Sequence, residues 1–558
     1  MPELIKGNHC YNLSGAQYGV YSDSACTKQV ATLTTDEKGS TETVTIEAGN
    51  YYIKEIKASQ GYLMDDKVYP VEIGYGDSKS ISVKEVPGYA KTALVLEKID
   101  KETGTSKSQG EASLEGTEFT VCYYDDYFDE NEIPDYDSYV SSAKRKWVIK
   151  TVKTEENGEV TYCADMGREE CRVEGDDYYR EENQIVIPLG TITIQETKAP
   201  KGYTIHNSYI QNAETKERKT GRMVTQIVQK EIGKTAKFQA GNCFKAADQV
   251  VRGDLSLRKV DGENDKAMAG VMFRLTSKTT GESHCFVTDE NGEYSTSSEF
   301  IRHSVNTNRE EQGDGIWFGI SQDGSDMEVN DNLGALPYDT YELCEIRGEE
   351  NAGATMYKDT ITIRKNQVVV ELNNIENYKI AIHTTAKGKE TGTHEIAPDN
   401  PVMVVDTVEC RYLEKNKRYR LSGILMDQKT EEPIKDEKGA TISAEKEFTA
   451  GSSEEKIEVE FTFDASKLEG KDIVVFEELY ELSDEGEEVL VAEHKEITDK
   501  GQTIHVRKTQ QEKIPETENK NPKKGVVKTG DTSRIGYLLI LLTVAFATIV
   551  LLIRKRRS

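Results

Sequence analysis

A short alternating segment that recurs along the chain is the feature that most constrains the fold. It reads IKEIKASQGY at residues 53–62, IQETKAPKGY at 194–203 and, more loosely, LCEIRGEENAG at 343–353. Side chains two positions apart lie on the same face of a β-strand, so each copy places a glutamate at the end of an apolar row. These glutamates are Glu55, Glu196 and Glu345. Each strand must therefore bury a carboxyl group, which is costly unless a partner lies beside it.

A second repeat supplies candidate partners for two of these glutamates. LVLEKID at residues 94–100 and LSLRKVD at 255–261 precede the second and third copies. The same two-residue period puts Lys98 and Lys259 on the apolar faces of these strands. Burial lowers the pKa of a lysine and raises that of a glutamate, so such a pair forms either a salt bridge or a nucleophilic amine beside a protonated acid. An Asn or Asp side chain alongside would let the amine form an isopeptide bond.

These motifs resemble those of SpaA-type domains, also called Cna B-type or prealbumin-like domains, of Gram-positive pilins and adhesins. The resemblance implies an isopeptide bond between a lysine on the first strand and an Asn or Asp on the last strand, assisted by the glutamate. Asp248 shares a strand face with Phe244, which favours it over Asn242. The implied sets are Lys98, Glu196 and Asp248 in residues 90–251, and Lys259, Glu345 and Asn377, with Asn374 as the alternative, in residues 252–378. Residues 1–89 keep Glu55 but have no lysine at the matching spacing, so we expect no bond there.

Residues 379–507 carry a different set of motifs, among them TTAKGKETGTHE, VMVVDTVE, VEFTFDASKLEGKDIVVFEELY and VAEHKEITDKGQTI. These closely resemble the VaFE-repeat, or Thr–Gln ester-bond, domain. In that family a threonine hydroxyl attacks a glutamine side-chain amide, releases ammonia and leaves an intramolecular ester, with His, Asp and Glu residues assisting. The residues implied here are Thr384, Gln502, Asp406, Glu477 and His494.

The two-residue period of a strand supports these residue assignments, because each of these side chains falls on an apolar face. Ile382 shares a face with Thr384, which favours Thr384 over Thr385 as the nucleophile. His494 is the candidate base for the hydroxyl, and the two carboxyl groups are candidates for moving the proton. The alternative is a set of hydrogen-bonded polar groups in an ordinary core.

The C-terminal region has the features of a wall-anchored protein. Residues 535–553 form an uncharged apolar span long enough to cross a bilayer as a helix, and the basic tail that follows places the C-terminus in the cytoplasm. VVKTGD at residues 526–531 resembles the cell-wall sorting signal of Gram-positive surface proteins, with Val527 in place of the usual proline. The resemblance implies that a sortase cuts between Thr529 and Gly530 and joins Thr529 to peptidoglycan or to a pilin.

The rest of the chain has an all-β pattern. Strand-like runs are separated by turn signals such as Asn-Gly, and an apolar fraction of 36% suits several small cores better than one large core. We expect tandem Ig-like or prealbumin-like β-sandwich domains, then a linker and one transmembrane helix. The expected units are residues 1–89, 90–251, 252–378, 379–507, a disordered wall linker at 508–525 and the sorting signal at 526–558 with its helix at 535–553. The first unit is expected to lack its first strand, and residues 1–7 show no signal peptide, so upstream sequence is expected to be missing.

Charge and cysteine content argue against several functions. A net charge of −28 disfavours nucleic-acid binding, which needs a basic face. The nine cysteines form no CxxC pair and no zinc-type cluster, so we expect neither a metal nor a cofactor. Cys10 and Cys26 flank one short segment and are able to pair, whereas most of the others are expected to be free buried thiols.

Three functions remain: a sortase-anchored structural or adhesive stalk at the cell surface, a pilus subunit that a sortase polymerises, and a surface enzyme. The enzyme is least favoured, because no motif such as G-x-S-x-G or a P-loop is present. The implied partners are the sortase, peptidoglycan or pilin, the membrane before processing, and a host matrix protein or glycan. Residues 123–139, YYDDYFDENEIPDYDSY, could bind a ligand or a cation, although an acidic solvated loop is the favoured interpretation.

Overall fold

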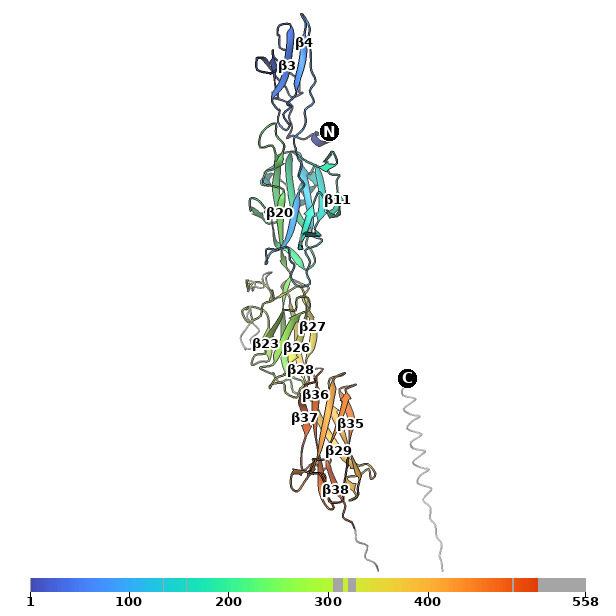
Figure 1. The fold of residues 1–558 in the computed structure, drawn as a ribbon. Helices are drawn as coiled ribbons and strands as arrows, with labels where there is room; N and C mark the ends of the chain where they lie inside the picture. The colour runs from blue at the N-terminus through green and yellow to red at the C-terminus, as the bar shows by residue number, and fades with distance from the viewer. Residues whose placement is uncertain are drawn as a thin grey trace, which may run out of the picture.

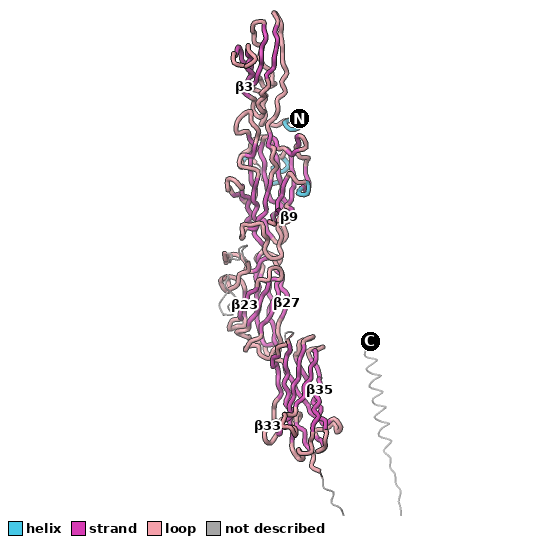
Figure 2. The backbone as a smooth tube through the Cα atoms, in the orientation of Figure 1, coloured by secondary structure: helices cyan, strands magenta, loops and turns pink. Residues whose placement is uncertain are grey.

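The computed structural model describes residues 2–133, 135–156, 158–304, 315–319, 328–483 and 486–509. Strands dominate this part of the chain, which confirms the predicted all-β fold. The helical elements described are short: α1 (Pro2–Ile5), η1 (Glu130–Glu132), α2 (Tyr136–Ser142) and η2 (Glu169–Cys171). Four β-domains follow one another end to end along a rod (Figures 1 and 2).

The predicted sorting signal at 526–558, its apolar span at 535–553 and all but the first two residues of the predicted linker at 508–525 lie outside the described residues. Among the helices that are described, none is long and apolar enough to cross a membrane.

The first domain has a single described sheet, in the antiparallel order β2-β1-β3-β4. Its buried face carries Tyr18 and Val20 of β1 and Glu55 of β3. The strands are β1 (Gln17–Tyr21), β2 (Gln29–Thr34), β3 (Gly49–Lys57) and β4 (Val68–Ile73).

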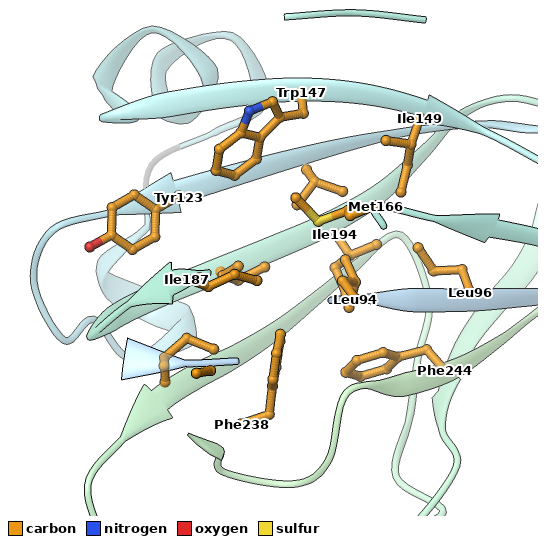
Figure 3. Close-up of a cluster of buried hydrophobic side chains, with 14 of the residues drawn as sticks. Leu94, Leu96, Tyr123, Trp147, Ile149, Met166, Ile187, Ile194, Phe238 and Phe244 are labelled. Carbon is orange, nitrogen blue, oxygen red and sulfur yellow. The ribbon is translucent and has the colours of Figure 1, made fainter. Parts of the chain in front are cut away.

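The second domain is a sandwich of two six-stranded sheets, with orders β17-β16-β20-β6-β10-β9 and β11-β8-β7-β15-β18-β19. Leu96, Trp147 and Ile194 meet between the sheets in a continuous apolar core (Figure 3). Its strands are β6 (Val95–Asp100), β7 (Glu118–Tyr124), β8 (Arg145–Lys150), β9 (Val152–Glu156), β10 (Glu159–Asp165), β11 (Arg172–Gly175), β15 (Gly190–Lys198), β16 (Tyr203–Asn212), β17 (Arg218–Lys219), β18 (Arg222–Val228), β19 (Lys237–Phe238) and β20 (Cys243–Val250). Two small ribbons pair β5 (Tyr89–Ala90) with β14 (Ile187–Pro188) and β12 (Arg180–Glu181) with β13 (Gln184–Ile185).

The third domain packs a sheet built on β21 against the sheet β23-β22-β26-β27. In the first of these, β21 pairs with β24, β25 and β28. The strands are β21 (Arg252–Asp261), β22 (Met272–Ser277), β23 (Ser283–Val287), β24 (Glu293–Ser295), β25 (Leu336–Pro337), β26 (Thr340–Ile346), β27 (Lys358–Thr362) and β28 (Val369–Asn377).

The fourth domain packs the sheet β29-β31-β35 against a seven-stranded sheet centred on β32 and β36. Its strands are β29 (Ala381–Gly388), β30 (Glu395–Ile396), β31 (Val402–Arg411), β32 (Arg418–Asp427), β33 (Glu432–Pro433), β34 (Ser443–Thr449), β35 (Glu454–Phe463), β36 (Asp472–Leu482), β37 (Glu488–His494) and β38 (Thr503–Val506).

The first and last strands of the second, third and fourth domains lie side by side. In the second domain β6 pairs in parallel with β20, and in the third β21 pairs in parallel with β28. In the fourth domain the amide of Ala386 on β29 donates to the carbonyl oxygen of Gly501, just before β38, at 2.9 Å. Each of these three domains thus brings the first and last strands of its own segment together.

Two sequence-based interpretations need correction. Cys10 and Cys26 do not pair: both are free, and Cys10 is buried in the core of the second domain while Cys26 lies between β1 and β2. Residues 123–139 are not simply a solvated loop, because Tyr139 of α2 is fully buried and its hydroxyl donates to Oε1 of Gln195 at 2.8 Å. The tyrosine rings bury large apolar areas and hold this segment on the sheet.

Candidate crosslink sites

In the second domain the structure brings together Lys98 of β6, Glu196 of β15 and Asp248 of β20. Nζ of Lys98 lies 2.7 Å from Oε2 of Glu196 and 2.6 Å from Oδ1 of Asp248. The register pairs Lys98 with Ala246, so Asp248 lies two residues further along the neighbouring parallel strand and on the same face. The alternative acceptor, Asn242, instead donates to the backbone of Ala93.

The electrostatics of this trio follow from its burial. The side chains of Lys98 and Asp248 are fully buried, and that of Glu196 is 3% exposed. Burial raises the pKa of the Glu196 carboxyl well above its usual value; the Lys98 ammonium opposes the rise and the Asp248 carboxylate adds to it. One ammonium faces two carboxyl groups, so holding Glu196 protonated leaves the site electrically neutral.

The third domain repeats this geometry with an amide as the acceptor. Nζ of Lys259 donates to Oδ1 of Asn377 and lies 3.3 Å from Oε2 of Glu345. The amide nitrogen of Asn377 donates to Oε1 of Glu345 at 2.6 Å, so the potential leaving group already contacts the acid. The alternative acceptor, Asn374, is exposed. Burial lowers the pKa of the Lys259 amine, an effect that Glu345 opposes.

A further residue that sequence reasoning missed, Asn351, holds Glu345 in place. Its side-chain amide donates to Oε1 of Glu345 at 2.8 Å, and the backbone amide of Tyr357 donates to Oε2 at 3.0 Å. Asn351 lies in the loop after β26, where the two-residue strand period no longer applies. The cluster Asn-Ala-Gly in LCEIRGEENAG, which marks a turn, was the only signal for it.

In the first domain Glu55 is buried, at 2% exposure, without a lysine. Its Oε2 accepts from the backbone amide of Asp65 at 2.5 Å, and its Oε1 has no hydrogen-bond partner among the described residues. The structure thus places no cation beside this carboxyl group within the described part of the chain.

In the fourth domain Thr384 and Gln502 meet in the core. Both are fully buried, and Nε2 of Gln502 donates to Oγ1 of Thr384 at 2.9 Å. The same nitrogen also donates to the backbone oxygen of His494 at 3.1 Å, which fixes the orientation of the amide. Thr385, the alternative nucleophile, points to the other face and is only partly buried.

Two fully buried carboxyl groups, Asp406 of β31 and Glu477 of β36, complete this site. Burial raises the pKa of both, and the charge of Asp406 raises that of Glu477 further; Thr384 contacts Asp406 and opposes its rise. Gly423 lies opposite Glu477 on β32, where a Cβ would stand 2.2 Å from Oε1 of Glu477. A glycine at this position therefore makes room for the buried acid.

His494 lies at the edge of the site and contacts the backbone rather than the hydroxyl. Its Nδ1 accepts from the backbone amide of Thr384 at 3.2 Å, and its Nε2 lies 3.3 Å from Asp499. The interpretation of His494 as the base for the hydroxyl is therefore not matched by the geometry, because strand parity fixes a face but not the atom that is reached. His383, His494 and Asp499 form the one described trio of side chains spaced to hold a metal ion.

The sheets and the buried side-chain clusters define a class of protein: tandem β-domains with candidate crosslink sites inside the domains. Residues 380–506 match the family described as T-Q ester bond containing domain, and residues 4–86 match SpaA, described as a prealbumin-like fold domain. The chain thus contains a domain of each family, which confirms the resemblance to Thr–Gln ester-bond and SpaA-type domains. A comparison with curated proteins found no match.

Solved structures similar to this chain come from Gram-positive bacteria. The Bacillus anthracis TIE protein is 19% identical, with a TM-score of 0.36, over 66% of this chain and 49% of that one. A Mobiluncus mulieris adhesin containing intramolecular disulfide, isopeptide and ester bond cross-links is 18% identical, with a TM-score of 0.20, over 23% and 57%. BcpA, the major pilin subunit of Bacillus cereus, is 15% identical, with a TM-score of 0.23, over 66% and 95%. The chain spans about half the length of the first of these.

Proposed function

We propose that the chain is a structural or adhesive stalk of the Gram-positive cell surface, stiffened by three crosslinks that it forms within itself. One observation carries the proposal: in three successive domains a nucleophile on the first strand contacts its acceptor near the last strand, beside a buried acid. The nucleophile–acceptor pairs are Lys98 with Asp248, Lys259 with Asn377 and Thr384 with Gln502. Because each reaction happens once and within one chain, the protein is not a turnover enzyme.

The two isopeptide bonds form by attack of a neutral lysine amine on a side-chain carbonyl carbon. In the third domain the Lys259 nitrogen bonds to Cγ of Asn377, and the C–N bond to the amide nitrogen breaks. Glu345, which contacts both nitrogens, takes a proton from the attacking Lys259 nitrogen and passes it to the departing ammonia. In the second domain the same attack on Asp248 releases water, and Glu196 takes the role of the acid.

The ester forms by attack of Oγ1 of Thr384 on Cδ of Gln502. Asp406, which contacts Thr384, takes the hydroxyl proton, and that proton leaves with the amide nitrogen as ammonia. Glu477, whose pKa burial and Asp406 raise, stays protonated throughout, so the two carboxyl groups carry a single negative charge before and after the reaction. His494 holds Gln502 through its backbone oxygen and Thr384 through its ring.

Anchoring is the second part of the proposal and rests on the C-terminal motifs. A sortase cleaves between Thr529 and Gly530 and transfers the Thr529 carbonyl to an amine of peptidoglycan or of a pilin, while residues 535–553 cross the membrane until processing. Expression of the chain behind a signal peptide in a Gram-positive host tests this. A single band released from the wall by muramidase, and the loss of this band in Thr529→Ala, would support single anchoring. A ladder of covalent polymers would instead favour the pilus subunit. Secretion of the unaltered chain would contradict both functions.

The intact mass of residues 1–509, measured after denaturation, tests the crosslinks. Loss of one water and two ammonia molecules lowers the mass by about 52 Da in total. Peptide mapping then assigns each loss to its pair. A mass equal to that of the unmodified sequence would mean that the three sites are ordinary buried polar clusters, and the stalk proposal would fail.

A further inference from the structure

The loop between β26 and β27, residues 347–357, lies between the third-domain site and the fourth domain. β26 ends one residue after Glu345, and β27 begins directly after the loop. One side of the loop contacts Glu345, and the other side contacts β36, β37 and the segment in front of β32. The position of the fourth domain can therefore affect the acid of the third domain through this loop.

The inner side of the loop holds each oxygen of the Glu345 carboxyl group. The side-chain amide of Asn351 donates to Oε1 at 2.8 Å, and the backbone amide of Tyr357 donates to Oε2 at 3.0 Å. The same two oxygens contact the reactants: Oε1 accepts from the amide nitrogen of Asn377 at 2.6 Å, and Oε2 lies 3.3 Å from Nζ of Lys259. The loop therefore sets the orientation in which the carboxyl group bridges the two nitrogens.

The isopeptide reaction depends on this bridge. Nζ of Lys259 bonds to Cγ of Asn377, Glu345 takes a proton from Nζ and delivers one to the amide nitrogen, and the Cγ–N bond breaks to release ammonia. The carboxyl group ends the step as it began, so it needs both contacts throughout. A displacement of about 1 Å in such a group can slow a reaction by about a hundredfold. Groups that fix the loop should therefore control the rate.

A carboxyl group of the fourth domain fixes the first half of the loop. Oε2 of Glu481 on β36 accepts from Nη2 of Arg347 at 2.7 Å. Nη1 of the same arginine donates to the carbonyl oxygens of Asn351 at 3.4 Å and Ala354 at 3.0 Å. The side chains of Arg347 and Glu481 are 19% and 12% exposed, so solvent screens the pair only in part. The ion pair thus holds the backbone of the residue whose side chain holds Glu345.

A second carboxyl group of the fourth domain fixes the second half of the loop. Oε1 of Glu414 accepts from the backbone amide of Met356 at 2.7 Å, next to Tyr357, whose own amide holds the other oxygen of the acid. Lys417 joins the two carboxyl groups, with Nζ 3.3 Å from Glu414 and 2.6 Å from Glu481. Both contacts of the acid are therefore backed by carboxyl groups of the fourth domain.

The backbones of the two domains also meet at this loop. The amide of Ile380, at the start of the fourth domain, donates to the carbonyl oxygen of Gly353 at 2.8 Å. Gly353 has a φ of +69°, and a Cβ there would lie 2.7 Å from the backbone oxygen of Val491 on β37. Glycine suits this position because it tolerates both the left-handed backbone and the close approach. The loop conformation that holds the acid therefore fits the docked fourth domain.

The acid of the second domain has no comparable support. Residues 199–202 form a short connection between β15 and β16. Oε2 of Glu196 contacts Nζ of Lys98 at 2.7 Å, and no donor from this connection holds the carboxyl group within the described part of the chain. The bond of the second domain should therefore form independently of the fourth domain, and it serves as an internal control.

We propose that the fourth domain positions the acid of the third-domain site, and that Arg347, Glu481 and Glu414 are positioning residues for its isopeptide bond. This inference rests on the proposed function, because it concerns the rate of a crosslink proposed there. When the fourth domain docks, the loop is fixed and Glu345 bridges the two nitrogens. The bond of the third domain therefore forms after the fourth domain has folded, although the third domain comes first in the chain.

The test follows bond formation in the full chain during cell-free synthesis with a mild detergent present. Samples are quenched in guanidinium at intervals, and peptide mapping then measures the three bonds, Lys98–Asp248, Lys259–Asn377 and Thr384–Gln502. Glu481→Gln should slow the third-domain bond by about tenfold or more, while the other two bonds form at wild-type rates. Glu481→Asp, which keeps the carboxylate, should restore most of the rate.

Glu445→Gln is the matched control, because it removes an ion pair with Arg420 inside the fourth domain. It should leave all three rates unchanged. Arg347→Met, which breaks the same contact as Glu481→Gln from the third-domain side, should also slow only the third-domain bond. Hydrogen exchange of β26 amides should stay at the wild-type rate in Glu481→Gln, which distinguishes a misplaced carboxyl group from an unfolded domain.

The possible outcomes separate this inference from the proposed function. Equal rates of the third-domain bond in the wild type and Glu481→Gln would overturn the inference and leave the proposed function standing. Equal slowing of all three bonds would also overturn it, because the variant would then disturb folding in general. Absence of the three bonds from the wild-type chain would instead contradict the proposed function, and this inference with it.

Discussion

At the scale of single residues, burial governs the chemistry of the proposed crosslink sites. Each of the three proposed sites encloses a candidate nucleophile and acceptor beside a buried carboxyl group, and burial raises the pKa of Glu196 in the second domain and of Asp406 and Glu477 in the fourth. The third domain adds direct contact between the acid, Glu345, and the amide nitrogen of Asn377. The acid is therefore the group whose loss should stop the reaction without removing either reactant.

Glu345→Gln should abolish the isopeptide bond of the third domain while leaving Lys259 and Asn377 in place. Glutamine cannot donate a proton to the departing ammonia, so the variant should retain about 17 Da relative to the wild type, after correction for the substitution. Losing a crosslink between residues 118 apart in sequence should also lower stability by about 4–5 kcal/mol on the disulfide analogy. Intact mass and urea unfolding measure the two effects.

Glu342→Gln is the matched control, because Glu342 lies on the same strand but faces Lys358 at the surface. It should form the bond as the wild type does. A wild-type mass in Glu345→Gln would contradict the role given to the buried acid, and loss of the bond in both variants would point to a general disturbance of β26.

The stability of the first domain should fall as pH rises through about 7. The folded state raises the pKa of Glu55 to about 7, so it favours the protonated carboxyl; this stabilisation is complete below the ordinary glutamate pKa and is lost as pH approaches the raised value. Hydrogen exchange of β3 amides, corrected for intrinsic rates, should therefore quicken between pH 5 and 8. Glu55→Gln should remove this dependence, whereas Glu47→Gln should keep it.

At the residue level, the sequence predicted those features that depend on the two-residue alternation of side chains along a strand. A period of two distinguishes inward from outward positions, so the placement of Thr384 rather than Thr385 could be predicted from the sequence, whereas the choice between Asn377 and Asn374 stayed open until the structure showed Asn374 exposed. The contacts of His494 and the supporting role of Asn351 could not, because they depend on where a strand ends and how the next loop turns. The two-residue period applies only within a strand and gives no information about contacts made outside it.

At the scale of elements, each proposed crosslink would join the strands on which a pull at the two ends of its domain acts. In the second and third domains the first and last strands are parallel neighbours, and in the fourth they are joined by a backbone hydrogen bond. A parallel pair loaded at opposite ends is sheared along its length. A covalent bond between the two strands would carry that load, and the residues between the strands would stay folded.

Turn chemistry predicted many of these elements. The Asn-Gly at residues 291–292 lies in a turn, as expected, and this turn connects β23 with β24 of the opposite sheet. For the first domain, the sequence predicted only that the first strand is missing; that the described residues form a single sheet is visible only in the structure.

Single-molecule stretching of the fourth domain should reveal its ester as a missing length. Thr384 and Gln502 are 118 residues apart, so the bond should hide about 40 nm of extended chain at about 3.5 Å per residue. Thr384→Ala should release that length in one step, whereas Thr385→Ala, on the other face, should not. A full-length extension in the wild-type domain would mean that no ester is present.

At the scale of the whole molecule, the rod depends on how the domains are joined (Figure 1). β20 ends at Val250 and β21 begins at Arg252, so one residue separates the second and third domains. Arg252 is fully buried there: Nη2 donates to Oε2 of Glu102 at 2.8 Å, and the guanidinium lies 3.8 Å from the ring of Trp317. Burial alone would raise the pKa of Glu102, but Arg252 holds it below its usual value.

The neighbouring junctions use smaller contacts of the same kind. Between the first and second domains, Gln229 donates to the carbonyl oxygen of Tyr62 at 3.0 Å and accepts from the amide of Gly61. Between the third and fourth, Arg347 lies 2.7 Å from Glu481. The charged pair with the deepest burial is the one between the second and third domains, so we expect that junction to control the straightness of the rod.

Glu102→Gln should loosen this junction, because it leaves the guanidinium of Arg252 buried opposite a neutral side chain. Breaking a buried ion pair by removing one partner typically costs about 3–5 kcal/mol, and here the chain can escape part of that cost by opening the junction and hydrating Arg252. Small-angle X-ray scattering of residues 1–509 should then show a shorter maximum dimension and a broader distribution of distances. Glu115→Gln, exposed on the same domain, should leave the curve unchanged. The proposed crosslinks lie within domains, so the masses of both variants should equal that of the wild type after correction for the substitution. An unchanged scattering curve for Glu102→Gln would mean that the other contacts at the junction hold the rod straight without this ion pair.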